Sequence, residues 1–149
     1  MSQYKSILLL VGFFATAQLG FAASWETDYA KALETAKREN KRVLVDFTGS
    51  DWCGPCIQLH KRVFSRPEFI EYAEKNLVLV EVDFPQRKKL SATLVKQNER
   101  LAQQYRIEEK GYPTLVLLDP AGKIVRELMG YDGETPADII AWIEGKGKR

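Results

Sequence analysis

The chain has 149 residues, of which 45% are hydrophobic and 28% are charged, a composition ordinary for a folded globular protein. These values exclude a disordered or collagen-like chain, and the length fits one compact domain. The formal net charge of +2 comes from 22 basic and 20 acidic residues, with no long block of one sign. We therefore expect no nucleic-acid partner, because binding a phosphate backbone requires a concentrated basic surface.

The first 22 residues have the pattern of a cleaved signal peptide. Lys5 gives a basic start, and residues 7–17 are almost wholly apolar but too few to span a bilayer comfortably. The small residues that follow fit cleavage after Ala22. We therefore expect residues 1–22 to be removed and residues 23–149 to form one domain, exported to a bacterial periplasm or secreted. The alternative is an uncleaved membrane anchor.

Hydrophobic periodicity in the first half of the remaining chain predicts a βαβ unit. Apolar residues recur at helical spacing after Ser24, which is a candidate N-cap. Residues 65–68 have the form of a capping box with proline in the first turn, which indicates a new helical segment. The expected elements are a helix over 24–40, a strand over 43–47, helical segments from Cys53 to Lys75, and a strand over 77–82.

The second half predicts a helix followed by a hairpin and a last helix. The next helix has one apolar stripe, whereas Lys96, Asn98 and Arg100 are expected to face water. Residues 119–122 form a turn signal between two strand-like runs, so these strands are antiparallel. The expected elements are a helix from 90 to 105, strands over 114–118 and 123–129, and a helix over 136–144. The fold class is thus α/β, with a mixed four-stranded sheet, helices on both faces and an extra N-terminal helix.

The only two cysteines, Cys53 and Cys56, lie between the first strand and the helix it enters. Unpaired N–H groups at a helix N-terminus favour a thiolate, so we expect a lowered pKa at Cys53 and a sulfur open to solvent. One helical turn brings Cys56 back toward Cys53. Cys53 would then attack a substrate disulfide, and Cys56 would resolve the mixed disulfide. Asp51 is a candidate cap of the same helix.

Two other uses of the cysteines have to be weighed. A structural disulfide closing four residues would contribute only about 2 kcal/mol, so it would stabilise the fold weakly. Metal binding would need His60 as a third ligand, but this residue lies about 10 Å further along the helix than Cys53. We therefore expect no metal, and redox chemistry is the favoured reading.

Two motifs together resemble the thioredoxin family. They are Trp52-Cys53-Gly54-Pro55-Cys56 after a buried strand, and Gly111-Tyr112-Pro113-Thr114 before the hairpin. The resemblance covers about residues 42–144 and implies a thioredoxin fold. It also implies that Pro113 is a cis-proline facing the disulfide and that the backbone of Tyr112 pairs with an extended substrate segment. The implied substrate-binding residues are Trp52, Gly54, Pro55, Tyr112 and Pro113.

The resemblance also assigns a role to Asp46, with departures from the family pattern. Asp46 matches the buried acid that accepts the proton of the resolving cysteine in thioredoxins. However, one extra residue separates it from Cys53, which could move the carboxylate away. The lysine that usually neighbours this acid has no match within residues 77–82, and Lys61 replaces the proline of the active-site helix. The surrounding sequence resembles the exported thioredoxin-like branch related to anterior-gradient and disulfide-transfer proteins.

These observations together predict a monomeric thiol-disulfide oxidoreductase that acts on protein thiols and disulfides without a bound cofactor. Reduction or isomerisation is favoured over oxidation, because a Gly-Pro pair between the cysteines resembles reductants. An oxidising compartment supplies no reducing power, so a membrane protein would have to deliver electrons. The competing hypothesis is a noncatalytic module that binds extended peptides and keeps the cysteines as a structural disulfide.

Overall fold

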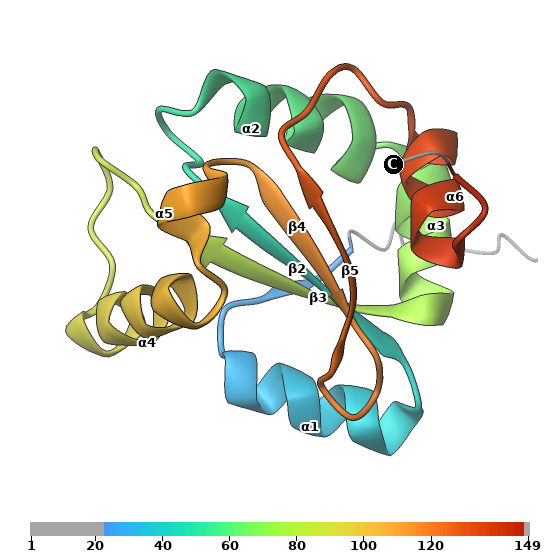
Figure 1. The fold of residues 1–149 in the computed structure, drawn as a ribbon, viewed down its shortest axis with the longest axis horizontal. Helices are drawn as coiled ribbons and strands as arrows, with labels where there is room; N and C mark the ends of the chain where they lie inside the picture. Colours follow the sequence, from blue (N-terminus) through green and yellow to red (C-terminus); the bar gives the residue numbers. More distant parts are fainter. Residues whose placement is uncertain (1–22, 148–149) are drawn as a thin grey trace, which may run out of the picture.

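The computed structural model describes residues 23–147, which build a five-stranded mixed sheet with helices on both faces (Figure 1). The expected signal peptide over 1–22 lies outside these residues. Within residues 23–147, no helix combines the length and the apolar character that crossing a bilayer would require.

The sheet contains the four expected strands and one more. Its order is β1-β3-β2-β4-β5. β1 and β2 each pair with β3 in parallel, whereas β4 is antiparallel to both β2 and β5. The expected βαβ unit and hairpin are therefore confirmed, and the sheet is wider than expected by one short edge strand. The strands are β1 (Trp25–Glu26), β2 (Arg42–Thr48), β3 (Leu77–Asp83), β4 (Thr114–Leu118) and β5 (Ile124–Met129).

The extra strand corrects the expected start of the first helix. Trp25 and Glu26 pair with β3, so Ser24 does not cap a helix. Instead the carboxylate of Asp28 accepts the backbone N–H of Lys31 at 3.0 Å and caps α1. Pairing with the open edge of β3 satisfies backbone groups that would otherwise be left at the end of the sheet.

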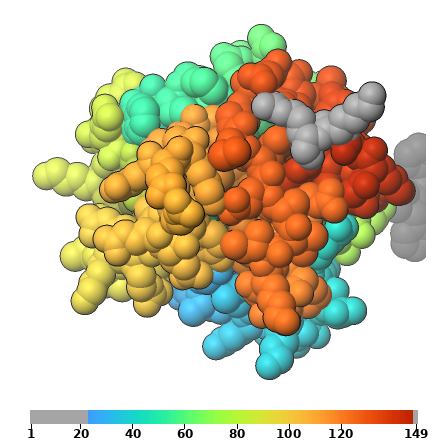
Figure 2. Space-filling model, viewed as in Figure 1, coloured from blue at the N-terminus to red at the C-terminus, as the bar shows by residue number. Residues whose placement is uncertain are grey.

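Helices cover both faces of the sheet. In Figure 1, α1 and α4 lie on one side of the strands, and α2, α3 and α6 lie on the other. Figure 2 shows that the chain between α5 and the end of β5 forms much of the surface on the viewed side. The helices are α1 (Tyr29–Glu39), α2 (Gly54–Leu59), η1 (His60–Phe64, a π-helical turn), α3 (Pro67–Asn76), α4 (Ala92–Gln104), α5 (Ile107–Lys110) and α6 (Pro136–Glu144).

The expected capping box at residues 65–68 is absent. The π-helical turn η1 continues α2 directly and ends at Ser65, whose hydroxyl lies 3.2 Å from Nδ1 of His60. Arg66 is the N-cap of α3 and makes no side-chain capping bond, while Pro67 occupies the first turn. The reason is that Ser65 already closes the preceding turn and cannot also begin the next helix.

The helix α4 differs from the helix expected from the sequence at its start and at one buried position. Its N-cap is Ser91, so Leu90 lies outside the helix. Asn98 was expected to face water, but it is buried and its side-chain amide donates to the backbone carbonyl of Asp83 at 2.9 Å. A polar side chain tolerates burial when such a partner exists, and this partner comes from a distant strand.

Strand alternation decides which side chains face the helix α2. On β2, Val43, Val45 and Phe47 pack in the core with α1 and the end of α4. Leu44 belongs to the opposite core, formed with α2, η1, α3 and α6. Because side chains alternate along a strand, Asp46 shares the face of Leu44 and lies beneath α2.

Candidate active site

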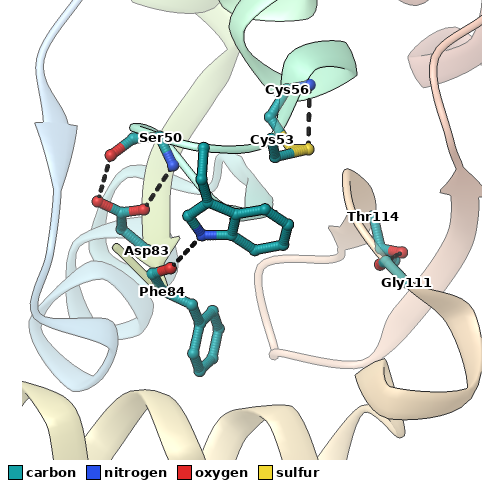
Figure 3. Close-up of a disulfide and its surroundings, with 8 residues drawn as sticks. Ser50, Cys53, Cys56, Asp83, Phe84, Gly111 and Thr114 are labelled. Atoms are coloured by element: carbon teal, nitrogen blue, oxygen red, sulfur yellow. Dashed lines mark hydrogen bonds between the residues drawn. A yellow bond between two sulfur atoms is a disulfide. The ribbon is translucent and has the colours of Figure 1, made fainter. Parts of the chain in front are cut away.

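Cys53 and Cys56 form a disulfide at the N-terminus of α2, with a Cα–Cα distance of 5.3 Å (Figure 3). Cys53 is the N-cap, and its sulfur accepts the backbone N–H of Cys56 at 3.3 Å. Gly54 and Pro55 are exposed between the two buried cysteines, with Pro55 in the first turn. An N–H donor aimed at Cys53 Sγ favours negative charge on that atom, as sequence reasoning predicts.

The exposure of the sulfurs differs from expectation. Cys53 is only 5% exposed and Cys56 4% exposed, so in the disulfide form Cys53 is not open to solvent. Exposure therefore does not distinguish an attacking from a resolving sulfur. Their surroundings differ, since Cys53 lies at the helix cap and Cys56 lines an inner cleft.

The cleft beneath α2 has a volume of about 280 Å³ and brings Cys56 and Asp46 together. Asp46 is 5% exposed, and its Oδ1 atom has no hydrogen-bond partner. Burial raises the pKa of Asp46 well above its ordinary value, and the nearby carboxylates of Glu81 and Asp83 raise it further. The extra residue before Cys53 thus does not remove the carboxylate from the cleft.

An aromatic group flanks the disulfide. Trp52 is 39% exposed, and its indole N–H donates to the backbone carbonyl of Phe84 at 2.7 Å. The ring of Tyr112 contacts both, with centroid distances of 5.7 Å to Trp52 and 5.5 Å to Phe84. Gly49 allows this arrangement, because a Cβ atom there would lie 2.4 Å from Cε2 of Trp52. The site thus combines a disulfide with an exposed apolar side chain.

The peptide bond between Tyr112 and Pro113 is cis, as the resemblance to thioredoxins implies. Pro113 is buried, and its carbonyl accepts the backbone N–H of Gly130 at 2.8 Å. The hydroxyl of Thr114 donates to the carbonyl of Gly111 at 2.8 Å. These bonds fix the loop that precedes β4, so its backbone has a defined position.

A polar network connects the active-site turn with the loop after β3. Asp83 accepts hydrogen bonds from the backbone N–H and the hydroxyl of Ser50, at 2.9 and 2.6 Å (Figure 3). Asp51 does not cap α2; its carboxylate accepts the backbone N–H groups of Gln86, Arg87 and Lys88. The bond from Gln86 is the largest cause of the lowered pKa of Asp51.

Sequence reasoning missed the acidic side chains that β3 contributes. Glu81 lines the cleft together with Asp46, and Asp83 anchors Ser50. The alternation of β3 could have found Glu81, because every second residue of that strand faces α2. His60 and Lys61 line the same cleft from the helix side. Within residues 23–147, no three His, Cys, Asp or Glu side chains are grouped so as to hold a metal ion.

Comparisons with known sequences identify relatives of this chain. The disulfide bond reductase DsbH of Chlamydia pneumoniae is 39% identical over 108 residues, which cover 72% of this chain and 63% of that protein. The thioredoxin-related protein DsbJ of the same organism is 31% identical over 115 residues, which cover 77% of this chain and 32% of that protein. The matches therefore span less than two thirds of the length of these curated relatives.

A solved structure and a family model agree with these relatives. The structure of a DsbH oxidoreductase matches with a TM-score of 0.73 and 33% identity, covering 93% of this chain and 96% of that chain. Residues 29–145 match the family model of the thioredoxin-like domain. This match covers most of the chain, so the chain belongs to the thioredoxin-like domain family.

Proposed function

We propose that this protein is a thiol-disulfide oxidoreductase that exchanges disulfides with exported protein substrates through Cys53 and Cys56. One observation carries the proposal: the disulfide joins the helix-capping Cys53 to Cys56, which lines a cleft together with the buried Asp46, whose Oδ1 has no hydrogen-bond partner. A disulfide kept for stability alone has no need of an acid beside one of its sulfurs. A four-residue loop would also contribute only about 2 kcal/mol to stability.

In the first step, the thiolate of Cys53 attacks a substrate disulfide. A mixed disulfide between Cys53 and the substrate forms, and the other substrate sulfur leaves as a thiolate that takes a proton from water. The N–H of Cys56, 3.3 Å from Cys53 Sγ, favours the attacking thiolate.

In the second step, Cys56 resolves the mixed disulfide. Its thiol gives a proton to the carboxylate of Asp46, and the resulting thiolate attacks Cys53 Sγ. The bond between Cys53 and the substrate breaks, and the second substrate sulfur leaves as a thiolate. Two electrons have then passed from the protein dithiol to the substrate, and the Cys53–Cys56 disulfide has formed.

We assign substrate binding to the surface around the disulfide. The exposed residues Trp52, Gly54 and Pro55 would contact the substrate on one side. On the other side, the backbone of Tyr112 beside cis-Pro113 would pair with an extended substrate segment, because an extended peptide can add to free backbone groups. Trp52 and Tyr112 are in ring contact, so these two parts form one surface.

The reaction needs electrons from outside the protein. The two thiols carry the reaction without a bound cofactor, and a second dithiol protein, which we place in the membrane, would reduce the disulfide again. We favour the reducing or isomerising direction, and a relative that covers 72% of this chain is called a disulfide bond reductase. The leader pattern of residues 1–22 supports export to the periplasm or beyond, and we propose a monomer.

A trapping experiment tests the proposal. The variant Cys56→Ser should accumulate covalent complexes with substrate proteins through Cys53, because it attacks but cannot resolve. Cys53→Ser should form none. Non-reducing gels of an extract exposed to each variant, with and without later dithiothreitol, provide the measurement. Absence of reducible complexes for Cys56→Ser would reject the proposal.

One observation favours a second candidate, a noncatalytic peptide-binding module. Both cysteine residues are almost fully buried in the disulfide form, as a structural disulfide would be. This candidate predicts that neither serine variant traps a partner and that peptide binding near Pro113 is unchanged in both. The trapping experiment therefore separates the two functions.

A further inference from the structure

Asp46 has an acidic neighbour on the adjacent strand. Asp46 on β2 is the register partner of Glu81 on β3 in the parallel pairing. Adjacent parallel strands lie about 4.8 Å apart, and register partners point to the same face of the sheet. The two carboxyl side chains are therefore neighbours, and both face α2.

The two acids share one cleft but differ in their access to water. Asp46 is 5% exposed and its Oδ1 has no partner, whereas Glu81 is half-buried. A cleft of about 280 Å³ has room for several water molecules. Glu81 is therefore the more exposed of the two carboxyl groups that line the cleft. The titratable or charged groups around Glu81 are Asp46, Cys56, His60, Lys61, Asp83 and Lys88.

We propose that Glu81 is a positioning residue that passes the proton of Asp46 to water in the cleft. The inference rests on the proposed function and deepens it. After Cys56 has protonated Asp46, and before the Cys56 thiolate attacks, the Asp46 carboxylic acid gives that proton to the Glu81 carboxylate, directly or through one water, so that the proton does not return to Cys56. Glu81 then releases it to solvent, and both carboxylates are ready for another turnover. No electrons move in these steps.

The other groups in the cleft fit this role less well. The carboxylate of Asp83 is held by Ser50 and by Lys88, whose Nζ lies 2.8 Å away. These contacts already occupy its carboxylate oxygens and leave it a poor relay. Burial and the charge of Asp83 raise the pKa of Glu81, which Lys88 and His60 partly oppose. Asp46 and Glu81 therefore both have a raised pKa.

The test measures the two chemical steps separately. The reduced protein reacts with oxidised glutathione in a single turnover, and acid-quenched samples are analysed by mass spectrometry for the mixed disulfide and the final disulfide. The variant is Glu81→Gln, which keeps the size of the side chain. The matched control is Glu34→Gln on the exposed side of α1. Asp46→Asn gives the decrease in the rate of the resolving step that is expected when the proton acceptor itself is absent.

We expect Glu81→Gln to slow the resolving step about tenfold at pH 7 and to leave the attack of Cys53 unchanged. Asp46→Asn should slow the resolving step more, by about 100-fold, the lower end of what a positioned base contributes. Sodium formate, a carboxylate small enough for the cleft, should restore most of the rate of Glu81→Gln. Glu81→Asp should stay within about threefold of the parent, because it keeps a carboxyl.

Two results would overturn the relay. One is a resolving rate for Glu81→Gln equal to that of Glu34→Gln. The other is a slower rate that formate does not restore, which a purely structural role would produce. If the parent forms no mixed disulfide and Cys56→Ser traps nothing, the proposed function itself fails. If trapping succeeds and Glu81→Gln behaves like the control, only the relay fails.

Discussion

Replacing Asp46 by Asn should stabilise the oxidised protein at alkaline pH. Burial raises the pKa of this carboxyl, so the folded state keeps its proton to a higher pH than the unfolded chain. The contribution of Asp46 to the free energy of unfolding is therefore greatest below its ordinary pKa. It decreases as the pH rises through the folded-state pKa, because the folded protein must then bury a charge.

The size of the effect follows from what the side chain lacks. Oδ1 of Asp46 accepts no hydrogen bond and the residue is 5% exposed, so its charged form has almost no compensation. A buried group without a partner costs about 1–3 kcal/mol, and more when charged. Asn has the same shape and no charge. We expect a gain in the free energy of unfolding of about 1–3 kcal/mol at pH 8, and little change at pH 4.

Urea denaturation of the oxidised protein at pH 4 and pH 8 measures this difference. In thermal unfolding, the melting temperature of a domain of this size should rise by about 3–5 °C for each kcal/mol gained in the free energy of unfolding. The variant Glu34→Gln, on the exposed side of α1, controls for the loss of one negative charge. The reasoning is refuted if Asp46→Asn has the same effect at both pH values, or if it lowers the stability at pH 8 below that of the control.

Three further substitutions test the packing around the site by urea denaturation. Gly49→Ala should lower the free energy of unfolding by about 1–3 kcal/mol and change the tryptophan fluorescence, because the new Cβ would lie 2.4 Å from the indole of Trp52. Unchanged stability and emission would contradict this. Asn98→Ala should lower the free energy of unfolding by about 1–3 kcal/mol, because it leaves the carbonyl of Asp83 without its buried donor. A loss below about 0.5 kcal/mol, as at exposed sites, would show that water replaces the Asn98 side chain as the donor. Phe69→Ala should lower the free energy of unfolding by about 3–5 kcal/mol, since the ring is fully buried between α3 and the sheet. A smaller loss would mean that the core collapses into the cavity.

Much of the fold was predictable because its signals are local. The apolar runs of β2 and β3, the turn at residues 119–122 and the helical stripe after Ser91 depend only on neighbouring residues. The same holds for the position of Cys53 at a helix N-terminus, which follows from the change from strand to helix pattern. The cis bond before Pro113 was implied by a resemblance and confirmed by the structure.

Other features required contacts between distant segments. Ser24 has the right chemistry for a cap, but the edge of β3 was free and residues 25–26 paired with it instead. Asn98 is polar and was therefore expected to face water, yet a backbone carbonyl 15 residues earlier in the chain accepts its side-chain hydrogen bond and allows its burial. The nearly complete burial of Cys53 likewise depends on how surrounding segments pack, which its helix-capping position does not reveal.

By itself, therefore, the sequence determined the order of the elements and the place of the two cysteines at a helix N-terminus, since strand and helix periodicity and helix polarity are properties of short segments. Only the tertiary structure decided the electrostatics of the cleft. The register of β2 against β3 places Glu81 beside Asp46, and Oδ1 of that acid is buried without a hydrogen-bond partner. A proton's affinity for a carboxyl depends on which charges and how much water surround it, and those neighbours come from elements far apart in the chain.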